Sequence, residues 1–170
     1  MILLGIGSNL SSKYGDRFTN INLSISLLES NLINIFKRSG FYETPSYPNK
    51  KYPKFINVVV KVSTKLSKED FIAALISIEE KLERRRNLKN EPRTCDIDIL
   101  DYHGKVTNFN YKNLIFKVPH EKLIFRNFVL YPLHEIEPNW KHPKTREKVS
   151  SLIEKLNEEN RKSILKVQKN

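Results

Sequence analysis

The sequence is poor in cysteine and contains no long apolar run. Its single cysteine, Cys95, excludes an intramolecular disulfide and fits a reducing compartment. The apolar neighbours of this cysteine predict a buried, unreactive thiol. No apolar run approaches the roughly 18 residues that a membrane span needs. The N-terminal MILLGIGSNL also lacks the basic stretch of a signal peptide. We therefore expect a cytoplasmic protein without a membrane partner.

Acidic residues are also few. The 19 Asp and Glu residues face 30 Lys and Arg, which gives a formal net charge of +11. A basic protein can attract a polyanion, but these lysines are scattered along the chain, so charge alone does not predict nucleic-acid binding. With 170 residues, 39% of them hydrophobic, the chain is long enough for one core. We expect a single domain over residues 1–170.

The apolar pattern alternates between the period of a strand and that of a helix. Strands are expected at residues 2–6, 35–44, 55–64 and 94–102, and after a turn at His103 and Gly104. A first helix is indicated by a stripe at helical spacing, formed by Phe18, Ile21, Ile25, Leu28 and Leu32. A second begins at a capping box of Ser67 and Asp70 and carries the stripe Phe71, Ala74, Leu75, Ile78 and Leu82.

The remaining segments add elements or loops. Residues 46–54 and 84–91 are expected to be loops, residues 123–136 fit either a strand or a helix, and residues 149–159 predict a last helix. The order β-α-β-β-α-β with appended elements predicts an α+β fold with a ferredoxin-like antiparallel sheet. With helices on both faces of the sheet, the arrangement would be a three-layer α/β/α fold.

Two acids alternate with isoleucines in PRTCDIDIL. On a strand, Asp96 and Asp98 would share one face while Ile97 and Ile99 enter a core. Two divalent ions held by such carboxylates can clamp a polyphosphate, and hard oxygen ligands suit Mg²⁺. The alternative interpretation is a surface strand with two solvated acids.

Arginines gather near these acids. Arg84, Arg85, Arg86 and Arg93 lie within ten residues of one another. Guanidinium groups pair bidentately with phosphate oxygens and neutralise charge in phosphoryl transfer. The alternative is a solvated helix C-terminus, where cations complement the helix dipole. Since GIGSNL lacks the lysine of the GxxxxGK(S/T) loop, phosphates would have to be held by arginines and metal.

Aromatic and amide side chains form a third group. Phe55 and Asn57 share a strand face by the period of two, Thr44 and Pro45 end the preceding strand, and Phe128 lies in RNFVLYPL. Two Phe rings could enclose a flat heterocycle, and Asn57 would form hydrogen bonds with its polar edge. The alternative is that both are core phenylalanines.

Several strings and their order resemble 6-hydroxymethyl-7,8-dihydropterin pyrophosphokinases of folate biosynthesis. The strings are GIGSNL, SGFYETP, FINVVV, PRTCDIDIL and VPHEKLIFRNFVLYPLHEI, which together span nearly the whole chain. The resemblance implies transfer of pyrophosphate from ATP to the pterin hydroxymethyl group, with release of AMP and two Mg²⁺ ions as cofactors. It implies ATP and the pterin as small-molecule partners, and we expect a monomer that binds no nucleic acid.

The resemblance also implies residue roles. Asp96 and Asp98 would ligate both metals and, with Arg84 and Arg93, carry catalysis. The ATP site would be formed by Glu79, Arg84, Arg86, Arg93, Ile99, His120 and Arg126. The pterin site would be formed by Gly7, Thr44, Pro45, Phe55, Asn57 and Phe128. The loop before Arg93 departs from the family pattern, because Glu83 replaces a common glycine and the loop lacks a tryptophan and one residue.

Two other functions would each account for part of the pattern. An RNA-binding module on a ferredoxin-like sheet would use the +11 charge and exposed aromatics. It would need an RNP-type pattern that the sequence does not contain, and it leaves the paired acids unexplained. A two-metal nuclease would use the same acids, but such sites usually need further carboxylates nearby.

Overall fold

The computed structural model describes residues 1–84 and 91–169. The strands are β1 (Ile2–Ser8), β2 (Ile33–Arg38), β3 (Phe41–Thr44), β4 (Phe55–Thr64), β5 (Asp96–Tyr102), β6 (Thr107–Tyr111), β7 (Leu114–Val118) and β8 (Leu165–Val167). The helices are α1 (Arg17–Ser30), α2 (Lys68–Lys81), a 3₁₀ turn (Leu123–Phe125), α3 (Asn127–Ile136), α4 (Val149–Glu154) and α5 (Glu158–Lys162). Among the described helices, none has the length and apolar character needed to cross a membrane.

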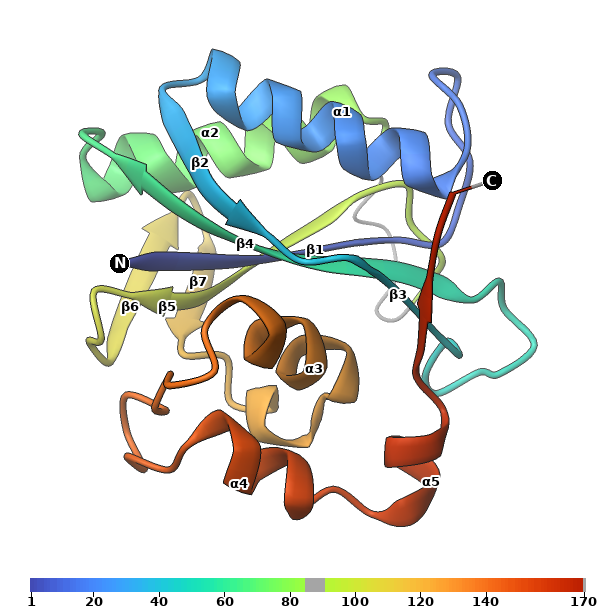
Figure 1. Cartoon of the computed structure of the whole chain (residues 1–170). Coiled ribbons are helices and arrows are strands. Elements are labelled where there is room, and N and C mark those ends of the chain that lie inside the picture. Colours follow the sequence, from blue (N-terminus) through green and yellow to red (C-terminus); the bar gives the residue numbers. More distant parts are fainter. Residues whose placement is uncertain (85–90, 170) are drawn as a thin grey trace.

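One six-stranded sheet forms the centre of the fold, in the order β5-β1-β4-β3-β8, with β2 also paired to β4. All of these pairings are antiparallel. Helices α1 and α2 cover one face of the sheet, and α3 and α4 cover the other (Figure 1). The predicted α+β class with an antiparallel sheet is confirmed.

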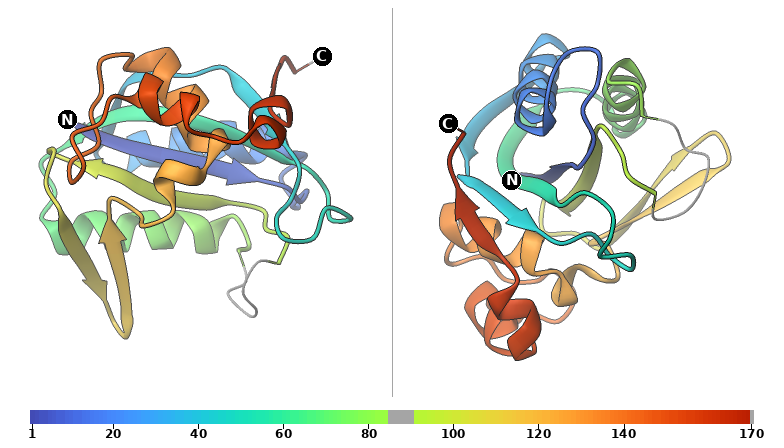
Figure 2. Two further views of the ribbon diagram at one scale, coloured as in Figure 1. Left: turned by 90° about the horizontal axis from the view of Figure 1, so that it is seen from below. Right: turned by 90° about the vertical axis from the view of Figure 1, so that its right-hand side faces the viewer.

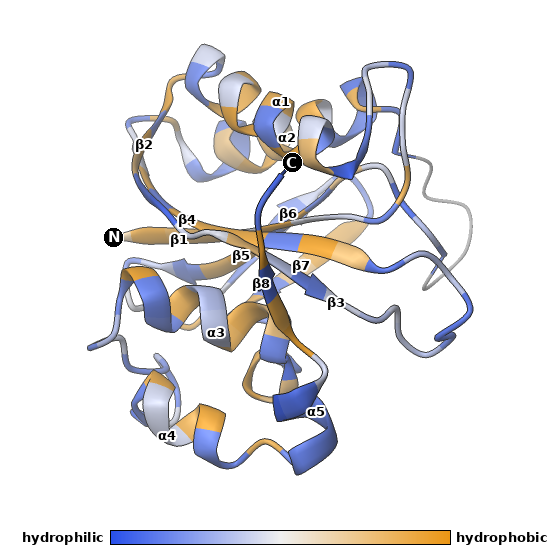
Figure 3. Cartoon of the chain, turned by 45° about the vertical axis from the view of Figure 1, so that its right-hand side comes forward, coloured by the Kyte–Doolittle hydropathy of each residue, from blue (hydrophilic) through white to orange (hydrophobic). Residues whose placement is uncertain are grey.

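Each face of the sheet has its own core, which explains why β1 and β4 are almost continuously apolar. Leu4 and Val60 point to the α1/α2 side, where Phe71 of α2 is fully buried. Leu3 and Val59 point to the other side, together with residues of α3 and α4. In Figure 3 the central strands accordingly carry the colour of hydrophobic residues.

The two long helices begin and end where local chemistry requires. The Ser67 side chain accepts a hydrogen bond from the backbone N–H of Asp70 at 3.0 Å, so the predicted cap of α2 is confirmed. The prediction that Leu32 belongs to the first helical stripe is wrong. Helix α1 ends at Ser30, and Leu32 lies beyond it with a positive φ of 63° and 69% exposure.

Two predicted elements are each divided in the structure. The strand expected at 35–44 is two strands, because Ser39 interrupts the ladder: its hydroxyl accepts a hydrogen bond from the N–H of Val59. The helix expected at 149–159 is also two, since Asn157 caps a new helix by accepting from the N–H of Asn160 at 2.8 Å. The apolar segment at 123–136 is a 3₁₀ turn followed by α3.

The strand expected after the turn at His103 and Gly104 is β6, whereas β7 and β8 were not predicted from the sequence. Strands β6 and β7 form a separate antiparallel hairpin that projects from the body of the protein (Figure 2, left). Near the C-terminus, β8 pairs with β3, where Leu165 lies opposite Glu43. This short strand extends the sheet beyond β3, so the C-terminal segment supports the strand that ends at Thr44.

Candidate active site

The two acids of β5 stand on the face of the sheet that α3 covers. Asp96 lies opposite Gly7 of β1, and Asp98 lies opposite Gly5. Their side chains are 24% and 36% exposed, whereas Ile97 is buried in the core on the other face. The alternation predicted for this strand is therefore confirmed, and both carboxylates are partly accessible on one surface.

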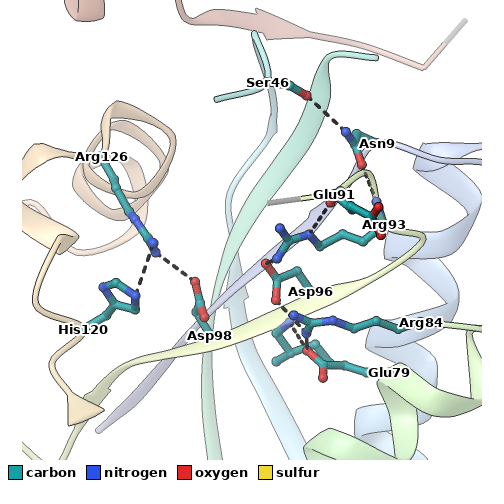
Figure 4. A network of polar contacts seen from close by, with 11 residues as sticks. Asn9, Ser46, Glu79, Arg84, Glu91, Arg93, Asp96, Asp98, His120 and Arg126 are labelled. Atoms are coloured by element: carbon teal, nitrogen blue, oxygen red, sulfur yellow. Dashed lines mark hydrogen bonds and ion pairs between the residues drawn. The ribbon is translucent and has the colours of Figure 1, made fainter. Parts of the chain in front are cut away.

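Arginines from three segments pair with these carboxylates (Figure 4). Asp96 forms ion pairs with Arg84 at 2.7 Å and with Arg93 at 2.8 Å, one on each carboxylate oxygen. Asp98 pairs with Arg126 at 3.1 Å. Cations therefore compensate the negative charge of the acids, although only one of the three arginines lies close to them in sequence.

Glu79 of helix α2 contacts the same site from the α1/α2 face of the sheet. Its carboxylate is 2% exposed, accepts a hydrogen bond from the N–H of Ile97 at 2.7 Å and pairs with Arg84. Burial opposes the charge of Arg84, but Asp96 and Glu79 outweigh it and raise the pKa of this guanidinium. Glu79 thus holds Arg84 and fixes the strand between the two acids.

The environment shifts two further groups. Burial, reinforced by the neighbouring Asp96, raises the pKa of Asp98. Burial, reinforced by Arg126, lowers the pKa of His120. The Nε2 atom of His120 lies 3.2 Å from the Arg126 guanidinium. Asp98, Arg126 and His120 therefore form a second polar group beside the one centred on Asp96.

Asn57 lies across the sheet from the acids, on the same face. It is directly opposite Gly7, which in turn is opposite Asp96, so the three positions form one row across β4, β1 and β5. The Asn57 amide is 5% exposed and donates hydrogen bonds to the Thr44 hydroxyl at 3.1 Å and the Tyr42 carbonyl at 3.3 Å. These bonds fix the orientation of the amide.

The glycine in this row keeps the space beside Asn57 open. A Cβ on Gly7 would lie 3.1 Å from the Asn57 Oδ1 and 3.5 Å from the Phe55 ring. Because most real Cβ contacts are longer than the first of these distances, a side chain at position 7 would press on both residues. Gly7 therefore places no side chain between Asn57 and Asp96 in this row.

The two aromatic residues assigned to the pterin each lie beside an arginine. The Arg93 guanidinium is 5.9 Å from the centre of the Phe55 ring, and that of Arg126 is 5.5 Å from the Phe128 ring. Both rings are partly buried. The arginines that pair with the acids thus also border the aromatic residues, so the two halves of the predicted site adjoin.

Some predicted site residues lie elsewhere or outside the described residues. Ile99 is 6% exposed, and its side chain packs in the α1/α2 core, on the face opposite the acids. Pro45 is half-buried directly after β3. Arg86 and the rest of residues 85–90 lie outside the described residues. Cys95 is buried as predicted, and burial raises the pKa of its thiol.

Two asparagines near the site were not singled out from the sequence. Asn9 is 2% exposed and bonds to Arg93, Ser46 and Pro53. Asn127 is 7% exposed, accepts from the N–H of Phe128 at 2.7 Å and donates to the C-terminal segment. Neither has a local pattern that separates it from the other asparagines, because most of the partners lie far away in the chain.

The donor set fits Mg²⁺ better than a transition metal. Among residues 1–84 and 91–169, no group of three or more His, Cys, Asp or Glu side chains is placed to hold a metal. Two carboxylates on one face supply hard oxygen ligands but leave most of the coordination shell open. Mg²⁺ usually keeps several waters and takes further ligands from substrate phosphates, so the Asp96 and Asp98 pair suits it.

The comparisons with known proteins agree with the sequence motifs. The sequence model of the 7,8-dihydro-6-hydroxymethylpterin-pyrophosphokinase family matches residues 3–138. A 2-amino-4-hydroxy-6-hydroxymethyldihydropteridine pyrophosphokinase of Aquifex aeolicus is 37% identical over 142 residues, which cover 84% of this chain and 83% of that protein. Its Bacillus subtilis counterpart is 34% identical over 134 residues, which cover 78% and 75% of the two chains.

Other similar proteins are much longer. The chain matches only 20% of the length of a folic acid synthesis protein of Schizosaccharomyces pombe, at 33% identity over 90% of this chain. A crystal structure of a Plasmodium falciparum HPPK-DHPS superimposes with a TM-score of 0.72 over 97% of this chain and 46% of that one. At 13% identity, this last match shows the fold alone. The family model and the two bacterial relatives show that the chain belongs to the 7,8-dihydro-6-hydroxymethylpterin-pyrophosphokinase family, as its motifs predicted.

Proposed function

We propose that the chain uses the row of Asp96, Gly7 and Asn57 to bring ATP and the pterin together. As a member of its family it is a pyrophosphokinase of folate biosynthesis, which transfers pyrophosphate from ATP to hydroxymethyldihydropterin. The observation that carries the assignment of the site is the pairing of Asp96 and Asp98 with three arginines, on the same face of the sheet as the Asn57 amide two strands away. The RNA-binding alternative receives no support from the comparisons.

Asp96 and Asp98 would hold two Mg²⁺ ions together with the phosphates of ATP. When bound, Mg²⁺ neutralises phosphate charge and polarises the phosphoryl group. With the acids holding metal, the guanidinium groups of Arg84 and Arg93 would be available to phosphate oxygens. Arg126 and His120, beside Asp98, complete the nucleotide side of the site.

The pterin would lie on the other half of the row. The Asn57 amide forms hydrogen bonds with the polar edge of the heterocycle. The bond from Asn57 to Thr44 fixes the orientation of this amide. Phe55 and Phe128 provide flat apolar surfaces, and Pro45 borders the ring. Gly7 provides the room that any larger residue would fill.

In the reaction, the pterin hydroxyl oxygen attacks the β-phosphorus of ATP. The bond from this phosphorus to the oxygen that bridges it to the α-phosphate breaks, AMP leaves, and the hydroxyl proton passes to water. The arginines stabilise the charge that develops on the transferred and leaving phosphates. Glu79 pairs with Arg84 independently of the two acids, so this guanidinium needs less ordering at the moment of reaction.

We also propose a fold type, a domain organisation, an oligomeric state and a location for the enzyme. The strand order β5-β1-β4-β3, with α1 and α2 on one face, supports a ferredoxin-like unit to which α3, α4 and β8 add a third layer. We propose that residues 1–170 act as one domain, as a monomer in the cytoplasm, without a nucleic-acid partner. The two bacterial relatives, of which the chain covers 83% and 75%, support a unit of this size.

The test is an assay for AMP formation with purified protein. We expect AMP only when ATP, Mg²⁺ and 6-hydroxymethyl-7,8-dihydropterin are all present, and none after chelation with EDTA. AMP formation without pterin would contradict the assigned acceptor. Cleavage of RNA or DNA under the same conditions would instead favour a two-metal nuclease.

A further inference from the structure

Asn9 lies between the two halves of the proposed site and bonds to both. It follows β1 in the turn GSN and is 2% exposed. Its Oδ1 accepts a hydrogen bond from the backbone N–H of Arg93 at 2.6 Å. Its Nδ2 donates to the Ser46 hydroxyl at 3.1 Å and to the Pro53 carbonyl at 3.0 Å. Figure 4 shows the side chain between Ser46 and Arg93.

On the nucleotide side, Asn9 fixes the backbone from which the Arg93 side chain extends. The Arg93 carbonyl accepts hydrogen bonds from the N–H groups of Asn9 at 3.0 Å and Leu10 at 3.1 Å. With the Oδ1 bond, both backbone polar groups of Arg93 are held by this one turn. The guanidinium of Arg93 in turn pairs with Asp96.

On the pterin side, Asn9 holds both ends of the loop between β3 and β4. Ser46 comes two residues after Thr44, and Pro53 comes two residues before Phe55. The Ser46 hydroxyl also donates to the Pro53 carbonyl at 2.5 Å, which closes the base of the loop. The Asn9 amide therefore fixes the spacing of the two loop ends that carry pterin residues.

The chemistry of the amide explains why this position suits asparagine. The group has two N–H donors and an acceptor oxygen, and here both donors and the acceptor are used. Aspartate could keep the bond from Arg93 but not the two donated bonds, and alanine would lose all three. A buried polar group without its partners is unfavourable, so each lost bond affects the loops that it joins.

We propose that Asn9 is a positioning residue that sets Arg93 and the β3–β4 loop relative to each other, so that binding of both substrates depends on it. The inference rests on the proposed function, because it takes Arg93 as a phosphate ligand and the loop ends as parts of the pterin site. Asn9 itself touches neither substrate. It acts through the residues that do.

Helix α1 contains a matched control. Asn20 is fully buried, accepts from the Ser12 hydroxyl at 2.6 Å and donates to the Leu10 carbonyl at 2.9 Å. It therefore supports the β1–α1 connection without bonding to either substrate loop. Asn20→Ala and Asn9→Ala each remove a buried amide from this region, but only the second disconnects Arg93 from the β3–β4 loop.

The experiment measures the Kd of a non-hydrolysable ATP analogue with Mg²⁺, and separately that of 6-hydroxymethyl-7,8-dihydropterin, by titration calorimetry. For Asn9→Ala we expect both Kd values to rise about tenfold, equivalent to about 1.4 kcal/mol. For Asn20→Ala we expect both Kd values to stay within about twofold of wild type. A twofold change in Kd corresponds to a free energy near the lower end of what one net hydrogen bond contributes. Melting temperatures of both variants report on folding.

A further variant separates the two sides. Asn9→Asp keeps the acceptor for Arg93 and loses the donors to the loop, so pterin binding should weaken while binding of the ATP analogue stays within about twofold. This variant also serves if Asn9→Ala does not fold. The positioning role is overturned if Asn9→Ala weakens neither ligand, only one ligand, or both no more than Asn20→Ala does. It is also overturned if Asn9→Asp leaves pterin binding unchanged. Failure of the wild type to bind either ligand would overturn the proposed function itself.

Discussion

Removing the charge of Asp96 should destabilise the protein in the absence of metal. Repulsion between two carboxylates would by itself predict that the loss of either one is neutral or stabilising. The arginines reverse this expectation for Asp96, whose two oxygens each pair with a guanidinium, at 2.7 Å and 2.8 Å. Asp98 has one such pair, at 3.1 Å, and a more exposed side chain.

The magnitude follows from these contacts. A hydrogen bond to a charged group contributes about 1.5–3 kcal/mol when it is well buried, and less when solvent screens it. Asp96 is 24% exposed and has two such bonds, one of them to Arg84, which is 12% exposed. We therefore expect Asp96→Asn to lower the free energy of unfolding by about 2–3 kcal/mol. Asp98→Asn should lower it by no more than about 1 kcal/mol, because its single ion pair is longer and more exposed to solvent and its charge is also disfavoured by the neighbouring Asp96.

Urea unfolding at pH 7.5 with EDTA, followed by circular dichroism, measures this difference. The slope with urea should not change, so that shifts of the midpoint report stability. Glu121→Gln is the control, since Glu121 forms an exposed ion pair with Lys117 and its loss should have no measurable effect. If Asp96→Asn were as stable as the wild type or more stable, repulsion would dominate the site and the reasoning would be refuted. Both Asp variants should lack pyrophosphokinase activity at saturating Mg²⁺.

Three further predictions follow from other contacts. Asn127→Ala should weaken pterin binding more than ATP binding in calorimetry, because the side chain holds the N–H of Phe128; equal losses would contradict this. Tyr42→Phe should lower the free energy of unfolding by about 1–2 kcal/mol in urea, since the hydroxyl donates to the Glu135 carboxylate at 2.8 Å. Burial lowers the pKa of His142, so the folded protein favours its neutral form. Stability should be complete above the unfolded pKa of about 6.5 and fall as the pH decreases below it. His142→Asn should reduce that decrease, and an unchanged pH profile of the melting temperature would exclude the contribution.

Much of the fold and part of the site could be predicted from local patterns. The period of two in β5 correctly placed Asp96 and Asp98 on one face and Ile97 in a core. The cap at Ser67 correctly located the start of α2. These features depend only on residues a few positions apart, so the backbone geometry of a strand or a helix is sufficient to predict them. The motifs around the acids also identified the family.

Other features depend on contacts between distant segments. The break at Ser39 arises because its hydroxyl bonds to β4, and β8 forms because β3 offers it a free edge. The pairing of Asp98 with Arg126 joins residues 28 positions apart, and that of Asn9 with Arg93 joins residues 84 apart. The sequence by itself determined the faces of the elements, the acids and the family. Only the tertiary structure decided which arginine meets which acid and that Asn9 bonds both to Arg93 and to the β3–β4 loop, because strand order and register bring these segments together and leave no local pattern.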